Sequence, residues 1–66
     1  MHNATPRHNA VIRKAEVQRR TGLSGRTIER LEAAGKFPAR RKLSARTVGW
    51  LEREVERWIL GRKARG

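Results

Sequence analysis

The stretch that most constrains the fold of this chain is VQRRTGLSGRTIERLEAAGKFP, residues 17–38. Gly22 lies just past the end of a first short helix, where a left-handed backbone is usually required. Ser24 is a preferred N-cap for a second helix over residues 24–34, and Gly35 is its matching C-terminal stop. Two short helices joined by a glycine-containing turn predict a helix-turn-helix unit.

The second helix of this unit has two distinct faces. At about 100° per residue, Ile28 and Leu31 fall on one side and are expected to face the core. The opposite face carries Arg26, Arg30 and Ala33, with Glu29 at its margin. Two arginines one turn apart are either a solvated polar face or a surface for contacts in a DNA groove, and the helix-turn-helix context favours the groove.

The net charge of the chain further restricts the class of binding partner. The 66 residues include 17 Lys and Arg but only 6 Asp and Glu, which gives a formal net charge of +11. Such an excess predicts attraction to a polyanion, with nucleic acid favoured over an anionic membrane surface. No apolar run approaches the roughly 20 residues needed to cross a bilayer, and no secretory signal is evident, so we expect a cytoplasmic, nucleoid-associated protein of a bacterial host cell.

Cysteine is absent, so neither a disulfide nor a thiolate metal site is expected. His2 and His8 lack further ligands nearby, and we expect neither metal nor cofactor.

The segment 1–10 is expected to be a disordered arm, with the alternative that it places Arg7 on a phosphate or in a minor groove. The domain proper is expected over residues 11–60.

The segment ARRKLSARTVGW, after Phe37 and Pro38, predicts a β-hairpin. Phe37 is expected to fill the junction after the second helix, because Pro38 prevents the helix from resuming. A turn at residues 44–45 or 44–47 would place Leu43, Val48 and Trp50 on a packed face. The same turn would leave the other face free for a ligand, with Arg40, Lys42, Thr47 and Gly49 on it. Between residues 36 and 46 there are five basic residues and no acidic one, which favours phosphate contact over a merely charged edge strand.

A third helix is expected from Leu51 or Glu52, followed by a basic tail over residues 61–66. Its buried stripe has the i, i+4, i+7, i+8 spacing and comprises Leu51, Val55, Trp58 and Ile59. The first helix is expected over residues 14–20, with Val17 buried and Ile12 folding back on it as a hydrophobic staple would. Trp50 is expected in the core, with base stacking as the alternative.

The ordered set of these segments resembles the AlpA-type regulators and excisionases of phages and prophages, within the MerR-like winged-helix group. The resemblance covers about residues 12–60. It is carried by Glu16-Val17, TGLSGRTIERLEAAGKFP, the Leu43-Ser44-x-Arg46 wing tip and VGWLEREVERWI. It implies a mainly α fold with a small β-hairpin, a winged helix-turn-helix of the order helix, helix, hairpin, helix.

The resemblance also implies sequence-specific binding of double-stranded DNA, with the second helix in a major groove and the hairpin as a wing. The family's contact positions match Ser24, Arg26, Thr27 and Arg30 in the helix, and Lys42, Ser44 and Arg46 in the wing. From the residues themselves, we expect Arg26 and Arg30 to read base edges and Ser24 and Thr27 to bind phosphate. The wing residues expected to follow the backbone are Arg40, Arg41, Lys42 and Arg46.

Two positions depart from the family pattern. Gly25 replaces a residue that is often polar or basic, which would remove one contact and loosen the first turn of the helix. Ala45 stands where glycine is common in the wing turn, which leaves the geometry of that turn open.

The output of such a protein would be transcriptional regulation or, as an excisionase, control of the direction of recombination. A tyrosine or serine integrase and further copies of the chain on repeated DNA sites are the implied protein partners. Non-specific nucleic-acid or RNA binding and docking on a recombinase through the third helix are the alternatives. An enzyme is not expected, because the sequence contains neither a nucleophile–base set nor a phosphate loop.

Overall fold

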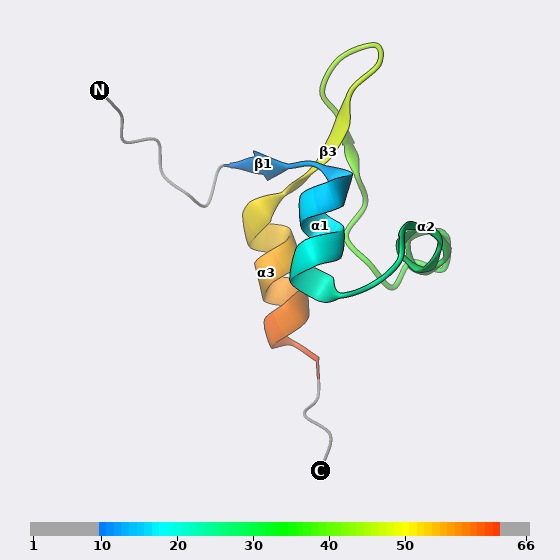
Figure 1. The fold of residues 1–66 in the computed structure, drawn as a ribbon, viewed down its shortest axis with the longest axis vertical. Coiled ribbons are helices and arrows are strands. Elements are labelled where there is room, and N and C mark those ends of the chain that lie inside the picture. Colours follow the sequence, from blue (N-terminus) through cyan, green and yellow to red (C-terminus); the bar gives the residue numbers. More distant parts are fainter. Residues whose placement is uncertain (1–9, 63–66) are drawn as a thin grey trace, which may run out of the picture.

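Three helices and three short strands form the fold of residues 10–62, the part of the chain described by the computed structural model (Figure 1). In chain order they are β1 (Val11–Ile12), α1 (Lys14–Thr21), α2 (Gly25–Ala33), β2 (Arg41–Lys42), β3 (Val48–Leu51) and α3 (Glu52–Leu60). This arrangement confirms the mainly α fold with a small antiparallel sheet. The predicted arm lies outside the described residues except for Ala10, as does the predicted tail except for Gly61 and Arg62.

The helix-turn-helix unit forms through the predicted local signals. Gly22 has a φ of 75° and ends α1, with its amide donating to the carbonyl of Gln18 at 2.8 Å. The hydroxyl of Ser24 accepts from the amide of Thr27 at 3.1 Å and so caps α2. Gly35, with a φ of 72°, follows the end of α2. Both glycines therefore occupy the left-handed conformation in which a side chain is disfavoured.

The sheet has a strand that the sequence analysis missed. Its order is β1-β3-β2, and β1 pairs antiparallel with β3 so that Ile12 lies opposite Trp50. Ile12 was predicted to fold back on the first helix as a hydrophobic staple would. It is buried in the core, but it reaches the core from a paired strand, which the prediction did not include. The amide of Glu52 also donates to the carbonyl of Ala10 at 2.8 Å and ties the start of α3 to this edge. A two-residue strand is too short to show a period-2 pattern.

The predicted faces of the hairpin are wrong by one residue. β2 pairs with β3 with Lys42 opposite Val48 and Arg41 opposite Gly49. Residues directly opposite one another share a face, so Lys42 lies on the side of Val48 and Gly49 is buried on the other side. The physical reason is an odd loop: residues 44–46 connect the strands, whereas an even turn was expected, and a shift of one residue exchanges the faces of every side chain.

Leu43 illustrates this correction. It was expected to pack with Trp50, but it is 45% exposed and closes the loop opposite Thr47, with its amide donating to the carbonyl of Thr47 at 2.7 Å. Among the described residues, only glycines have a positive φ, so Ala45 needs no glycine-like conformation in this loop. The three-residue connection is compatible with alanine at that position.

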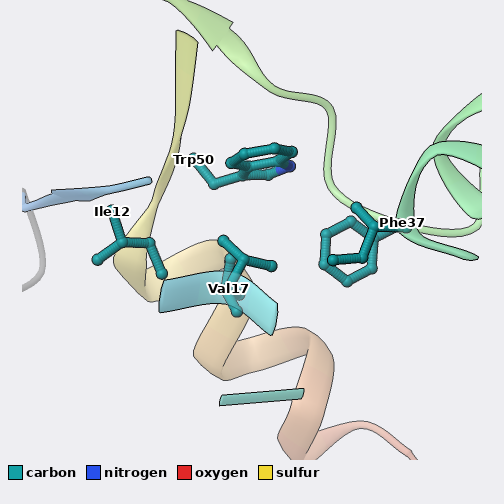
Figure 2. Packing of buried hydrophobic residues seen from close by; sticks show 6 residues of the cluster. Ile12, Val17, Phe37 and Trp50 are labelled. Carbon is teal, nitrogen blue, oxygen red and sulfur yellow. The ribbon is translucent and has the colours of Figure 1, made fainter. Parts of the chain in front are cut away.

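The core lies between the sheet, α1, α2 and α3 (Figure 2). Trp50 is fully buried, as predicted, and so are Val17 and Ile28. The remaining buried apolar side chains are Ile12, Phe37 and Val55. Leu31, Trp58 and Ile59 pack against this cluster while remaining partly exposed. Val55, Trp58 and Ile59 of the predicted stripe therefore face the core, and Val55 alone among them is fully buried. Leu51, the first residue of the predicted stripe, ends β3 and is partly exposed.

Both tryptophans hold the connector between α2 and the hairpin. The indole nitrogen of Trp50 donates to the carbonyl of Pro38 at 3.1 Å, and that of Trp58 donates to the carbonyl of Lys36 at 2.8 Å. Phe37, which lies between Lys36 and Pro38 in the chain, is buried and packs edge-on to Trp58, with ring centroids 4.7 Å apart. The junction role predicted for Phe37 is confirmed, and the connector has a fixed position relative to the core.

None of the described helices is both long enough and apolar enough to cross a membrane.

Candidate nucleic-acid interface

All six glutamate side chains, which lie within residues 10–62, are engaged in ion pairs with lysine or arginine. The pairs are Lys14–Glu29, Arg19–Glu16, Arg20 with Glu16, Glu52 and Glu56, Arg40–Glu32, and Arg41–Glu54. The negative charge of the protein is thus neutralised internally. The cations outside these pairs determine where a polyanion would be attracted.

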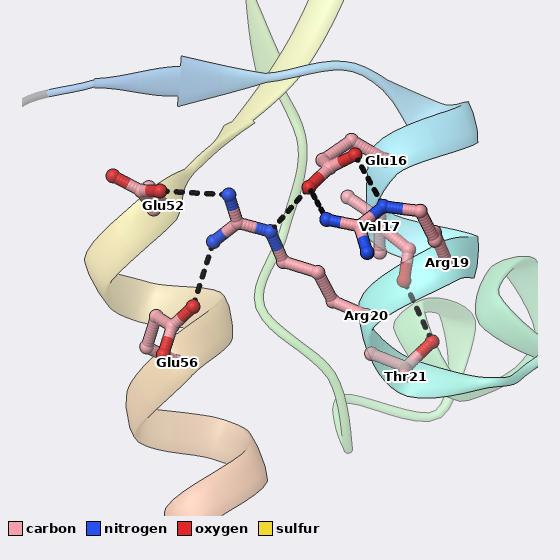
Figure 3. A network of polar contacts seen from close by, with 7 residues as sticks. All are labelled: Glu16, Val17, Arg19, Arg20, Thr21, Glu52 and Glu56. Carbon is pink, nitrogen blue, oxygen red and sulfur yellow. Dashed lines mark hydrogen bonds and ion pairs between the residues drawn. The ribbon is translucent and has the colours of Figure 1, made fainter.

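Arg20 is the centre of the largest of these networks (Figure 3). Its guanidinium lies 2.7 Å from Glu16 of α1 and reaches Glu52 and Glu56 of α3 at 2.8 and 2.6 Å. The hydrogen bonds from Arg19 and Arg20 lower the pKa of Glu16 to about 2. The network joins α1 to α3. The sequence analysis assigned no role to Arg20, because two of its three partners, Glu52 and Glu56, lie more than 30 positions away in the chain.

The exposed face of α2 is the first part of the candidate interface. Arg26 and Arg30 are both exposed, on the predicted face, and neither has an ion-pair partner among residues 10–62. Ile28 is fully buried on the opposite side. The buried side of the helix is thus held by the core, while the two exposed guanidinium groups make no side-chain hydrogen bond to another described residue and keep those donors for a ligand.

The N-terminal end of α2 adds a set of hydrogen-bond donors. The hydroxyl of Ser24 donates to the hydroxyl oxygen of Thr27 at 3.0 Å while accepting from its amide. This leaves the hydroxyl hydrogen of Thr27 available to a ligand. The amides of Gly25 and Arg26 belong to the first turn, which has no acceptor of its own within the helix. Such an end favours an anion.

The wing is the second part of the candidate interface. Lys42, Ser44 and Arg46 are exposed, and neither of the two basic side chains is ion-paired within the described segment. The hydroxyl of Ser44 accepts from the amide of Arg46 at 3.4 Å, a long contact within the loop. Arg41 is also exposed but pairs with Glu54 of α3 at 2.8 Å.

Arg40 differs from the other predicted contact residues. It forms hydrogen bonds to Glu32 of α2 through both its backbone amide and its guanidinium. The guanidinium also lies over the ring of Trp50, 5.1 Å from its centroid, and the pKa of Arg40 is raised by the bond to Glu32. Its donors face the protein, so this side chain joins α2 to the wing.

The structure gives a reason for glycine at position 25 that the sequence analysis did not find. A Cβ atom at this position would lie 2.8 Å from Cε of Lys14, so glycine leaves room for that side chain to pass along the start of α2. Lys14 then pairs with Glu29. The first turn is held by Ser24, and the predicted loosening at Gly25 is not seen in the cap geometry.

A metal site within residues 10–62 would require several converging ligand side chains. No group of three or more His, Cys, Asp or Glu side chains is placed to hold a metal ion there. The side chains brought together on α2 and on the wing are basic or hydroxyl-bearing, which suits hydrogen bonding to phosphate and to base edges.

The fold is that of a small helix-turn-helix domain with a wing. Residues 10–63 match the family model described as Prophage CP4-57 regulatory protein (AlpA), and the chain belongs to this family. The chain is also similar to "Uncharacterized protein ORF88" of Enterobacteria phage P4, with 42% identity over 53 residues. These residues make up 80% of this chain and 60% of that relative, so the chain spans less than two thirds of its length.

Proposed function

We propose that this AlpA-family protein binds double-stranded DNA in a sequence-specific manner and acts as a transcriptional regulator of a phage or prophage. The observation that carries the proposal is the distribution of paired and unpaired charge. Every glutamate side chain is ion-paired within the protein, whereas Arg26, Arg30, Lys42 and Arg46 are among the exposed cations that have no ion-pair partner in the part that the structure describes. These four cations lie on the two elements that a winged helix-turn-helix presents to DNA.

In the proposed mechanism, α2 enters the major groove with Arg26 and Arg30 toward the base edges. A guanidinium that keeps its donors free can bind O6 and N7 of guanine in a bidentate manner. Ser24, Thr27 and the first amides of α2 bind a phosphate beside the groove, where the helix N-terminus favours negative charge. Phosphate contacts would fix the register of the helix, and the arginines would supply the sequence preference.

The wing contributes contacts to the flanking backbone. Lys42 and Ser44 would bind phosphate, and Arg46 at the tip would enter the minor groove. Arg41 is exposed enough to exchange Glu54 for a phosphate. Arg40 contributes by holding the wing against α2, because its hydrogen bonds are satisfied by Glu32.

A single module of this size has a limited contact area, on the order of 600–1,000 Å². We therefore propose cooperative binding to repeated sites or assistance by a partner. An excisionase that directs a tyrosine or serine integrase is the alternative output of the same DNA-binding surface. Titration onto one isolated half-site tests the cooperativity, since nanomolar binding there at physiological salt would contradict it.

The direct test is selection of bound sequences from a random pool of duplexes, followed by competition at 150 mM salt. An enriched motif that competes far better than random duplex or double-stranded RNA of equal length supports the proposal. Equal competition by all three would identify a non-specific nucleic-acid binder. A protein that selects no motif and keeps its regulatory output after changes at Arg26 and Arg30 would be an interaction module instead.

A further inference from the structure

Glu29 is the one carboxylate that lies at the margin of the arginine face of α2. Its side chain is 55% exposed, and its Oε2 atom lies 2.5 Å from Nζ of Lys14 at the start of α1. Glu32, the other acidic residue of α2, is turned away toward Arg40. A negative charge beside the proposed DNA-binding surface would repel phosphates, so its presence there needs an explanation. The position of Glu29 relative to Arg26 provides that explanation.

Glu29 follows Arg26 by three positions, a spacing at which side chains on a helix are neighbours. A carboxylate free to rotate would therefore pair with Arg26 and occupy donors that a base requires. Glu29 remains ionised at neutral pH, since Lys14 first, and then Arg40 and Arg26, lower its pKa. The arrangement seen in the structure has Glu29 on Lys14, and Arg26 without an ion-pair partner in residues 10–62.

Gly25 makes this arrangement possible. The Lys14 side chain passes where a Cβ of residue 25 would stand, with Cε at 2.8 Å and Nζ at 3.2 Å from that position. Lys14 can therefore reach Glu29 across the first turn of α2. The three residues act together. Gly25 leaves space beside the first turn of α2, the side chain of Lys14 occupies that space, and its ammonium group holds the Glu29 carboxylate on the side of α1.

We propose that Lys14 is a positioning residue for DNA recognition, which holds the Glu29 carboxylate on the α1 side of α2 and thereby keeps Arg26 free to contact a base. The inference rests on the proposed DNA-binding function. Lys14 acts through Glu29 and need not touch the DNA itself. Loss of Lys14 should consequently harm recognition only while Glu29 carries its charge.

A double-mutant cycle tests this relationship. Dissociation constants for the selected duplex and for random duplex are measured for the wild type, Lys14→Met, Glu29→Gln and the double variant. We expect Lys14→Met to lose about tenfold in affinity for the selected site, and the double variant to bind within about threefold of Glu29→Gln alone, since residues in contact show such coupling. Lys14→Arg, which preserves the pair, should bind as the wild type does.

Arg53→Met provides the charge control, because Arg53 is exposed on α3 and lies outside the proposed interface. It removes one positive charge as Lys14→Met does, and it should weaken the selected and random duplexes alike. Circular dichroism melting of each variant shows whether the fold is retained. If Lys14→Met weakens both duplexes alike, as the control does, and Glu29→Gln does not restore the loss, Lys14 is a phosphate contact and the inference is overturned.

A measurement without DNA separates this inference from the proposed function. The side-chain Nε–H resonance of Arg26 in NMR spectra should shift in Lys14→Met, as Glu29 turns toward it, and return in the double variant. An unchanged resonance overturns the positioning role even where DNA binding is specific. The resonance could also shift in Lys14→Met and return in the double variant while the protein selects no duplex. That result would confirm the contact between Lys14 and Glu29 but refute the DNA-binding function, and with it the role of Lys14 in recognition.

Discussion

Arg40 and Glu32 are joined by three short hydrogen bonds that link the end of α2 to the start of the wing. The amide of Arg40 donates to Oε2 of Glu32 at 2.8 Å, and its guanidinium donates to Oε1 through Nε at 3.0 Å and Nη2 at 2.6 Å. The Glu32 side chain is only 13% exposed. The guanidinium also covers the face of the buried Trp50. The orientation of the wing relative to α2 therefore depends on this pair.

Arg40→Ala should reduce the free energy of unfolding by about 1–3 kcal/mol, because it leaves a partly buried carboxylate without its charged donor. Urea unfolding monitored by tryptophan fluorescence measures the change. Arg41→Ala is the matched control, since its pair with Glu54 is more exposed and should contribute less than about 1 kcal/mol. Equal losses of unfolding free energy in the two variants would show that the Arg40–Glu32 pair stabilises the fold no more than the exposed Arg41–Glu54 pair does.

Arg30 and Lys42 should differ in the kind of DNA affinity they supply. Arg30→Ala should cost about 1–3 kcal/mol at the selected site and relax the preference at one base pair, whereas Lys42→Ala should weaken all duplexes and lower the salt slope by about one. Both side chains are exposed and are not ion-paired within the described residues, so neither change removes a known intramolecular contact. Fluorescence anisotropy over a series of salt concentrations distinguishes them. Equal weakening of specific and random duplex by Arg30→Ala would refute its role as a reader.

The parts of the fold that local signals determine could be predicted from the sequence. Gly22, Ser24 and Gly35 fix where helices end and begin through their own backbone and side-chain hydrogen bonds. The helical periodicity of α2 also gave its buried side, with Ile28 inward. The arginine face then follows by exclusion.

The parts that depend on long-range pairing could not be predicted. The register of the hairpin depends on an odd loop closed by Leu43 and Thr47, and no residue in that loop has a positive φ that would mark it. The pairing of Arg40 with Glu32 was not predicted, because side chains eight positions apart meet only after the chain has turned at Gly35. Ionic partners outside one helix have no periodicity to reveal them.

Glu16 should make stability depend on acid pH. Its pKa falls from 4.5 to about 2 in the folded protein, because it accepts hydrogen bonds from Arg19 and Arg20. A carboxylate with a lowered folded-state pKa stabilises fully above its unfolded value, and this contribution is lost as the pH falls from about 4.5 to about 2. Thermal melts of the wild type and Glu16→Gln should differ at pH 6 and converge near pH 2. A constant difference over that range would contradict the assignment.

Gly49→Ala should destabilise the fold by about 1–3 kcal/mol, the usual cost of overpacking. An added Cβ would stand 2.6 Å from Cγ1 of Val11 and 3.0 Å from the carbonyl oxygen of Ile12. The Val11 side chain can rotate away, but the backbone oxygen can move only if β1 separates from β3. Gly25→Ala is the contrasting variant, because its new methyl would meet only the flexible ends of the Lys14 and Gln18 side chains. Chemical denaturation should therefore show a clear loss for Gly49→Ala and little loss for Gly25→Ala. If both glycines tolerate alanine equally, the close approach of β1 to β3 does not depend on residue 49.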